Sequence, residues 1–192
     1  RGLGDVYKRQ TLKVVMALNY GNIKKTDIAN GIGIRVSLFV SGCTRHCKNC
    51  FNSETWDFNY GNPFTNEPED EIIESLSKSY INGLTVLGGE PFEVRNQREI
   101  LPFIKRIRKK LPNKTIWFYT GCTLENELQK EGYWRCKVTD ELLANIDVLV
   151  DGPFIESLYD ISLCFRGSSN QRIIDMKKTL ESGNVVLWNN KQ

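Results

Sequence analysis

Three cysteines lie close together in one short segment of the chain. Cys43, Cys47 and Cys50 have the spacing Cys-x3-Cys-x2-Cys. As thiolates they can bind three irons of a four-iron, four-sulfide cluster. The fourth iron then has no protein ligand and stays open to a substrate. The spacing therefore indicates an iron–sulfur centre with one free coordination position.

Zinc is the alternative ligand for such a group of cysteines. A structural zinc site usually takes four ligands from Cys and His. The fourth ligand would be His46, the only histidine in the chain, and its place next to Cys47 makes one tetrahedral site awkward. No second Cys-x2-Cys pair completes a zinc ribbon or finger. The cluster is the favoured interpretation, and a small zinc-binding interaction module is the alternative of a different class.

The elements that position the cysteines are predicted from apolar runs along the chain. The cysteine segment follows a predicted strand over residues 34–40. Three more apolar runs predict strands over residues 84–87, 115–119 and 146–150, and helices are expected near residues 69–81, 96–111 and 123–130. This alternation indicates parallel strands with helical crossovers. Because a closed eight-stranded barrel needs about 250 residues, the chain of 192 residues predicts an α/β fold with a partial, open (β/α) barrel.

Four candidate segments follow the predicted strands directly. They are the cysteine segment, Gly88-Gly89-Glu90-Pro91, Thr120-Gly121 and Asp151-Gly152. Ligands collect at the carboxyl ends of the strands in α/β folds. We therefore expect one composite active site at this edge. The glycine pair could instead form an ordinary strand-to-helix turn, and Asp151 could either orient a ligand or cap a turn.

Length and composition agree with a single globular domain. Apolar residues make up 40% of the chain, and the net charge of +3 makes no case for nucleic-acid binding. Residues 1–15 do not lead into the pattern that follows. We therefore predict a non-native or disordered N-terminal segment over residues 1–15 and a single domain over residues 16–192.

The sequence also bears on location and on the other cysteines. No apolar stretch approaches the length of a membrane span. No secretory signal is visible, so reduced thiols and a cytoplasmic location are expected. Cys122, Cys136 and Cys164 have no ligand spacing and are predicted to be buried free thiols. Trp117 and Trp134 are expected to fill the core.

The cysteine segment and the Gly88-Gly89-Glu90-Pro91 turn together resemble the radical S-adenosylmethionine (SAM) enzymes. Members of that superfamily cleave SAM at an open cluster iron to make a carbon radical. The resemblance implies a [4Fe-4S] cluster and SAM as cofactors, and a partial barrel of the radical SAM type as the fold. It also implies that the three cysteines serve both as metal ligands and as the catalytic centre.

Further segments resemble one family within this superfamily, the activating proteins of anaerobic ribonucleoside-triphosphate reductases. The segments that carry this likeness are residues 27–35, 50–52, 150–154 and 165–172, and the match extends from about Asn19 to about Asp175. The run Arg166-Gly167-Ser168-Ser169-Asn170-Gln171 points to this family. The resemblance implies an oxidoreductase that installs a glycyl radical in the reductase. An activase of another glycyl-radical enzyme, such as pyruvate formate-lyase, is the alternative of the same class.

The resemblance also implies how SAM would be held. Gly88 and Gly89 have no side chains, so backbone groups could approach the methionyl end. Glu90 or neighbouring carbonyls would accept hydrogen bonds from its ammonium group.

The adenine would lie against the backbone that leads to Cys50, together with Phe51. Many members of the superfamily carry an aromatic residue where Asn49 stands, so only a backbone contact is expected there. The electron would come from an external one-electron donor such as flavodoxin.

Overall fold

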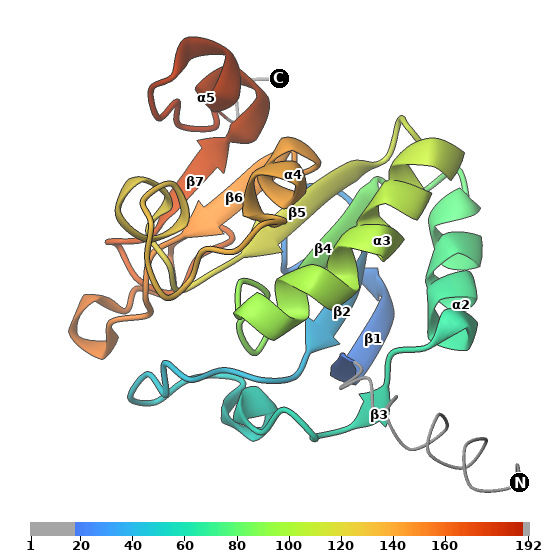
Figure 1. Cartoon of the computed structure of the whole chain (residues 1–192), viewed down its shortest axis with the longest axis horizontal. Helices are drawn as coiled ribbons and strands as arrows, with labels where there is room; N and C mark the ends of the chain where they lie inside the picture. The colour runs from blue at the N-terminus through green and yellow to red at the C-terminus, as the bar shows by residue number, and fades with distance from the viewer. Residues whose placement is uncertain (1–17, 190–192) are drawn as a thin grey trace, which may run out of the picture.

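The computed structural model describes residues 18–189, so the predicted segment over residues 1–15 lies outside the described range. The fold is built on one seven-stranded sheet with the order β3-β1-β2-β4-β5-β6-β7 (Figure 1). The strands are β1 (Asn19–Asp27), β2 (Arg35–Val40), β3 (Asn62–Pro63), β4 (Gly83–Gly88), β5 (Thr115–Tyr119), β6 (Val148–Asp151) and β7 (Arg172–Asp175). The α-helices are α2 (Asn66–Ser77), α3 (Val94–Lys110), α4 (Thr139–Ala144) and α5 (Met176–Ser182). Short helical turns occur at Ser53–Trp56, Leu124–Leu128 and Glu156–Leu158.

The centre of the sheet is parallel, as predicted. Strands β2, β4, β5 and β6 run in the same direction, with Leu84 opposite Val36 on one side and Ile116 on the other. Almost every residue of β2 and β4 is buried, because both faces of a central parallel strand are covered. The four strands predicted from apolar runs are these four.

Three antiparallel strands at the edges were not predicted. β1 pairs with β2, β3 pairs with β1, and β7 pairs with β6, all antiparallel. β1 is rich in polar and partly exposed residues, so it lacks the apolar signal of the central strands. The edge strands β3 and β7 are not paired with each other, so the sheet stays open. The α/β class and an open sheet are therefore confirmed.

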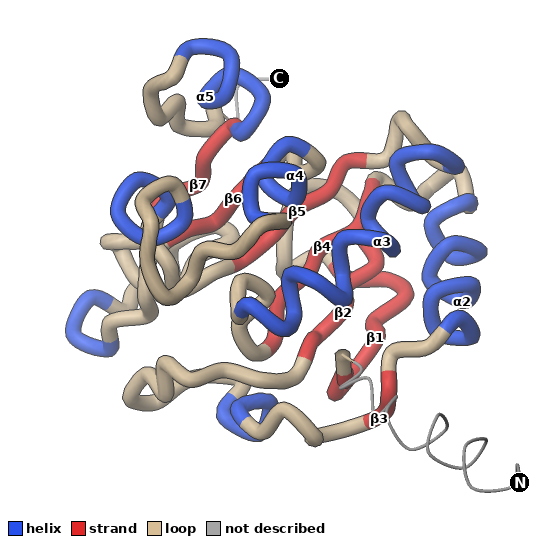
Figure 2. The backbone as a smooth tube through the Cα atoms, viewed as in Figure 1, coloured by secondary structure: helices blue, strands red, loops and turns tan. Residues whose placement is uncertain are grey.

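The main helices lie on one face of the sheet. Figure 2 shows α3 and α4 in front of the strands, α2 at the right beside β1, and α5 beyond β7 at the far edge. The main core lies between these helices and the sheet and includes Leu38, Val86 and Phe118 from the strands and Leu76 and Ile104 from the helices. A second, smaller cluster contains Trp117, Val148 and Val150. The buried position predicted for Trp117 is confirmed.

Several helix predictions need correction. α2 begins at Asn66, before Pro68, because a proline is tolerated in the first turn, where its missing N–H has no helical partner. It ends at Ser77 and does not extend to residue 81. The helix expected over 123–130 is a single π-helical turn, Leu124–Leu128. The short helices α4 and α5 were not predicted.

A fully buried arginine joins the amino ends of the parallel strands. Arg35 donates from Nε to Thr85 Oγ1 (2.7 Å), from Nη1 to Thr115 Oγ1 (2.9 Å) and from Nη2 to the Leu84 carbonyl (2.7 Å). Its guanidinium also lies 5.2 Å from the centre of the Trp117 ring. Burial lowers the pKa of Arg35 to about 10. These contacts stabilise the end of the sheet opposite the cysteine segment.

Within residues 18–189, no helix has both the length and the apolar character that crossing a bilayer requires.

Candidate functional site

The four segments that follow the parallel strands meet around one cavity. Its lining includes Cys43, Cys47 and Cys50 after β2, Gly88, Gly89 and Glu90 after β4, Thr120 and Gly121 after β5, and Gly152 after β6. This convergence follows from the parallel order, which brings the carboxyl ends of β2, β4, β5 and β6 to one edge. The composite site expected at this edge is therefore present as a shared cavity.

The three cysteines are free thiols around this cavity. Cys43 is buried, whereas Cys47 and Cys50 are partly exposed. Burial raises the pKa of Cys43 to about 11 and also raises the pKa of Cys47. Binding of iron would therefore have to displace protons from these thiols.

The side chains of the described residues do not suit a single metal ion. Across the described range, no three His, Cys, Asp or Glu side chains are grouped so that they could hold one ion. In a four-iron cluster each thiolate binds a different iron, so its thiolates are spread around the cluster instead of meeting at one ion. Three thiols that share one cavity fit that requirement. His46, the fourth ligand in the zinc alternative, stacks on Trp56 with 4.5 Å between the ring centres.

The glycine turn packs directly against the cysteine segment. Gly89 N donates to the Val40 carbonyl at 2.7 Å, and Glu90 N donates to the Gly42 carbonyl at 2.8 Å. Gly88 has a φ of +108°, which favours glycine. A Cβ on Gly89 would lie 2.6 Å from the Gly42 carbonyl oxygen. Close approach of two backbone segments therefore already requires glycine here.

The carboxylate of Glu90 is fully buried beneath this turn. Its Oε1 accepts from Phe92 N (2.9 Å) and Thr120 Oγ1 (2.7 Å), and its Oε2 accepts from Gly121 N (2.8 Å). Burial raises the pKa of this carboxyl group. Glu90 thus joins the turns after β4 and β5 through three of its hydrogen bonds, while it also lines the cavity.

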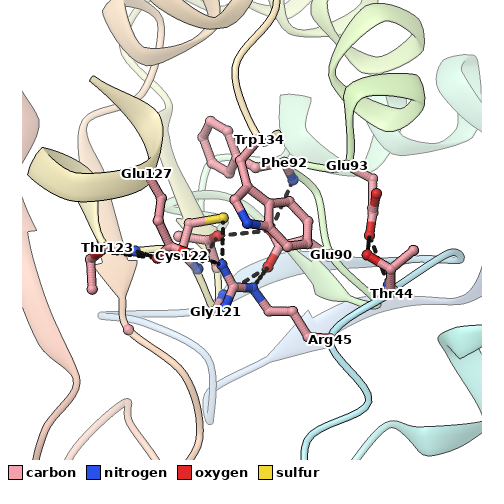
Figure 3. Close-up of polar contacts among 12 residues, drawn as sticks. Thr44, Arg45, Glu90, Phe92, Glu93, Gly121, Cys122, Thr123, Glu127 and Trp134 are labelled. Carbon is pink, nitrogen blue, oxygen red and sulfur yellow. Dashed lines mark hydrogen bonds and ion pairs between the residues drawn. The ribbon is translucent and has the colours of Figure 1, made fainter. Parts of the chain in front are cut away.

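Arg45 was not identified from the sequence, although it lies between two of the cysteines. Its Nη2 contacts Glu127 Oε1 at 2.5 Å and Cys122 Sγ at 3.1 Å (Figure 3). The guanidinium lies 4.3 Å from the centre of the Trp134 ring. Beside it, Thr44 donates from its backbone N to Glu93 Oε1 at 2.7 Å. Side chains from the segments that follow β4 and β5 therefore hold the residues between Cys43 and Cys47 in place.

These contacts also decide the predictions for the remaining cysteines and for Trp134. Cys122 is a buried free thiol, as predicted. Cys136 is only partly buried and Cys164 is exposed, so the prediction is wrong for both. Cys164 lies in an irregular segment outside the core, where spacing carries no information on burial. Trp134 is partly buried and covers the guanidinium of Arg45, in addition to packing against the core.

A second cavity adjoins the first and has a volume of about 440 Å³. The two cavities share part of their lining, including Cys50, Tyr119 and Gln171. The aromatic residues around the second cavity are Phe39, Phe51, Tyr119, Phe154 and Phe165. Phe51 is 65% exposed, and its ring centre lies 5.0 Å from that of Phe154. Asn49 lines neither cavity, because its side chain donates to Glu156.

The run from Arg166 to Gln171 reaches this site. Gln171 Oε1 accepts from Gly167 N at 2.9 Å, and Gln171 Nε2 donates to the Gly152 carbonyl at 3.1 Å. Arg166 donates to the Gln171 carbonyl at 2.6 Å. Arg166 and Gly167 line the second cavity, and Gln171 lines both cavities. Apart from the resemblance of the run, nothing in the sequence indicated that these residues lie at the site.

Of the two interpretations of Asp151, the structural one fits its contacts. The side chain is fully buried and accepts from Leu124 N, the first residue of the π-helical turn, at 2.9 Å. It also accepts from Arg172 Nε at 2.9 Å, across the β6–β7 pair. Asp151 therefore caps a turn and joins β7 to the sheet, while its neighbour Gly152 lines the cavity.

Comparisons with known proteins agree with this geometry. A family model described as a 4Fe-4S single cluster domain matches residues 29–174. A protein of Pasteurella multocida is 43% identical over 158 residues, which cover 81% of this chain and 96% of the relative. A protein of Escherichia coli K12 is 44% identical over 156 residues (80% and 96%), and one of enterobacteria phage T4 is 38% identical over 156 residues (81% and 93%). All three relatives are named anaerobic ribonucleoside-triphosphate reductase-activating protein.

Proposed function

Because the chain belongs to the family of anaerobic ribonucleoside-triphosphate reductase-activating proteins, we propose that it activates such a reductase by generating a glycyl radical on it. The observation that carries this proposal is the shared cavity at the carboxyl edge of the sheet, around which all three cysteines of the Cys-x3-Cys-x2-Cys segment lie. The matched relatives are covered almost completely, so the proposal concerns the whole activity and not one part of a larger protein.

Cys43, Cys47 and Cys50 are the proposed ligands of a [4Fe-4S] cluster. The match to a single-cluster 4Fe-4S family supports the cluster, and the three thiols around one cavity support the ligand set. When bound, the cluster would supply one electron to SAM and yield a carbon radical. The protein would contribute a buried position for Cys43 and a rigid backbone around the segment.

SAM is proposed to occupy the second cavity and the adjoining edge of the first. A volume of about 440 Å³ falls within the usual range of about 300–1,000 Å³ for small-ligand pockets. Cys50 and Phe51 would contact the adenine end, and the carbonyls of the Gly88-Gly89 turn would accept from the methionyl ammonium. Glu90 would act by holding that turn. Asn49 remains a candidate for contact with the adenine only through its backbone.

The reductase must place its glycine near SAM, and an open sheet leaves room for that segment. We therefore propose that the described fold is a partial barrel of the radical SAM type and that the domain extends over residues 16–192. A one-electron donor such as flavodoxin and a cytoplasmic setting belong to the same proposal. Neither the pyruvate formate-lyase alternative nor the zinc module gains support from any contact among the described residues.

The decisive experiment is an anaerobic reaction of the protein with SAM, a reductant and the candidate reductase, followed by electron paramagnetic resonance (EPR). A glycyl radical signal on the reductase, and none on pyruvate formate-lyase under the same conditions, is the expected result. Equal radical yields on both targets would leave only the general activase function. Absence of iron–sulfur absorbance from the anaerobically reconstituted protein would refute the proposal altogether.

A variant can separate partner contact from SAM cleavage. Arg166 lines the second cavity. Its side chain also donates a hydrogen bond to the Gln171 carbonyl and so helps to hold the loop that contains both residues. Arg166→Ala should reduce radical transfer to the reductase more than it reduces SAM cleavage without the reductase. An equal loss of both activities would show that Arg166 serves SAM binding or the loop fold instead.

A further inference from the structure

We propose that Arg45 is a positioning residue that fixes a positive charge beside the cluster and so raises its reduction potential. This inference rests on the proposed function, because it assumes that the three cysteines hold a cluster. Arg45 lies between Cys43 and Cys47 in the sequence and lines the same cavity as all three cysteines. Its side chain is only 15% exposed. It is therefore part of the wall of the site.

The position of the guanidinium is determined by several elements. Glu127 and Cys122, both from the segment after β5, contact Nη2 at 2.5 and 3.1 Å. Trp134 lies against the guanidinium, 4.3 Å from its central carbon to the ring centre. A Cβ on Gly121 would lie 2.6 Å from Arg45 Cδ, so the side chain passes directly over that glycine (Figure 3). An arginine held in this way cannot turn out to solvent without breaking these contacts.

One donor of Arg45 has no acceptor. Its Nε–H is buried, and no acceptor within hydrogen-bond range is found for it among residues 18–189. The carboxylate oxygen Glu90 Oε2 lies 3.6 Å from it, which is too far for a hydrogen bond. A buried donor without a partner is costly in a folded protein. Because Nε is itself buried, it does not open onto the cavity, so Arg45 would act on a bound cluster through its charge.

The charges around Arg45 explain why its own charge matters. Glu90 and Glu93 are buried next to the cysteine segment, and Glu127 is partly buried beside Arg45, so three carboxylates lie in this region. With Arg45 the four side chains carry a net formal charge of −2, and without Arg45 they would carry −3. Reduction adds one electron to a centre that thiolates already make negative. Nearby charge and hydrogen bonds to sulfur are the levers that set such potentials, and charge acts strongly where water is excluded.

The test is a reductive titration of the reconstituted protein, followed through the EPR signal of the reduced cluster, with iron and sulfide counted for each variant. For Arg45→Gln with full iron content, we expect the ratio of reduced to oxidised cluster at a fixed potential to fall at least tenfold. This corresponds to a midpoint potential lower by about 59 mV for one electron. Arg45→Lys keeps the charge and should recover most of that difference. An Arg45→Gln midpoint equal to that of the wild type would overturn the inference.

A second variant covers the case in which Arg45→Gln fails to hold iron. Glu127→Gln keeps Arg45 and removes one carboxylate charge beside it, so it should shift the midpoint in the opposite direction, upward. A midpoint that is unchanged or lower in Glu127→Gln would also overturn the inference. A wild-type protein without any cluster signal would instead refute the proposed function, so the two failures are distinguishable.

Discussion

Replacing Gly89 by alanine should destabilise the fold where the glycine turn meets the cysteine segment. A Cβ at this position would lie 2.6 Å from the carbonyl oxygen of Gly42 and 3.0 Å from that of Thr55. Both oxygens belong to the backbone, so no flexible side chain can move away. The two segments must therefore separate. A side chain on Gly89 is therefore expected to affect the fold and not SAM binding alone.

The size of the effect follows from the contacts that the separation disturbs. Glu90 N donates to the Gly42 carbonyl at 2.8 Å, and Gly42 N donates to the Thr55 carbonyl at 2.8 Å. Overpacking typically costs about 1–3 kcal/mol, and a weakened hydrogen bond adds about 1 kcal/mol. We expect the free energy of unfolding to fall by about 2–4 kcal/mol, which lowers Tm by about 4–16 °C for a chain of this length. Because Gly42 precedes Cys43, iron uptake should fall as well.

The assay is urea unfolding of the iron-free protein, with iron and sulfide analysis after reconstitution. Gly132→Ala is the matched control, because its Cβ would have no described heavy atom of another segment within 4 Å. This control should change the free energy of unfolding by less than about 1 kcal/mol. The reasoning is refuted if Gly89→Ala is as stable as the control, takes up full iron and loses only SAM affinity. In that case the side chain points to the ligand and not to the backbone.

Three further predictions concern the ligands, the core and pH. Cys47→Ala should abolish the iron–sulfur absorbance and SAM cleavage. Cys164→Ala, which changes an exposed thiol, should retain both. A Cys47→Ala protein that cleaves SAM at the wild-type rate would contradict the assignment of Cys47 as a cluster ligand. Arg35→Met should lower the free energy of unfolding by about 3 kcal/mol, because it leaves several acceptors of the Arg35 hydrogen bonds without a donor. A loss below about 1 kcal/mol in urea unfolding would argue that these hydrogen bonds do not stabilise the sheet. The hydrogen bond from Arg172 lowers the pKa of Glu125 in the folded protein. The stabilisation from this pair is therefore present above the pKa of an unfolded glutamate, about 4.3, and is lost as pH falls through the folded pKa. Glu125→Gln should therefore make stability less dependent on pH below about 4.3, and an unchanged acid-unfolding profile would count against this pair.

The central strands could be predicted because each carries its own signal. The apolar runs behind β2, β4, β5 and β6 are short, continuous and bounded by glycine or polar residues. Such runs are typical of parallel strands that are covered on both faces. The outer antiparallel strands β1, β3 and β7 carry no such signal, because they lie at or next to the edges of the sheet and accept polar, partly exposed residues.

The candidate ligands were predictable for a similar reason. Cys43, Cys47 and Cys50 lie within one loop, so their spacing alone limits what they can bind. The parallel order of the strands then implied that the later turns would meet this loop. Both inferences need only local sequence and a general rule of α/β topology, and the cavity bears out the convergence.

The surroundings of the cysteines depended on contacts between distant parts of the chain. Arg45 meets Cys122 and Glu127, which lie about 80 positions further along, and Glu90 is tied to Thr120 and Gly121. No local pattern distinguishes Arg45 or Glu127 from an ordinary surface arginine or glutamate, and the Gly88-Gly89-Glu90-Pro91 turn singles out Glu90 without showing which groups it contacts. By itself, therefore, the sequence determined the central parallel strands and the three thiols that share a loop, because both are encoded by neighbouring residues. Only the tertiary structure decided which charges border those thiols and where glycine is indispensable, because both depend on how closely separate backbone segments approach.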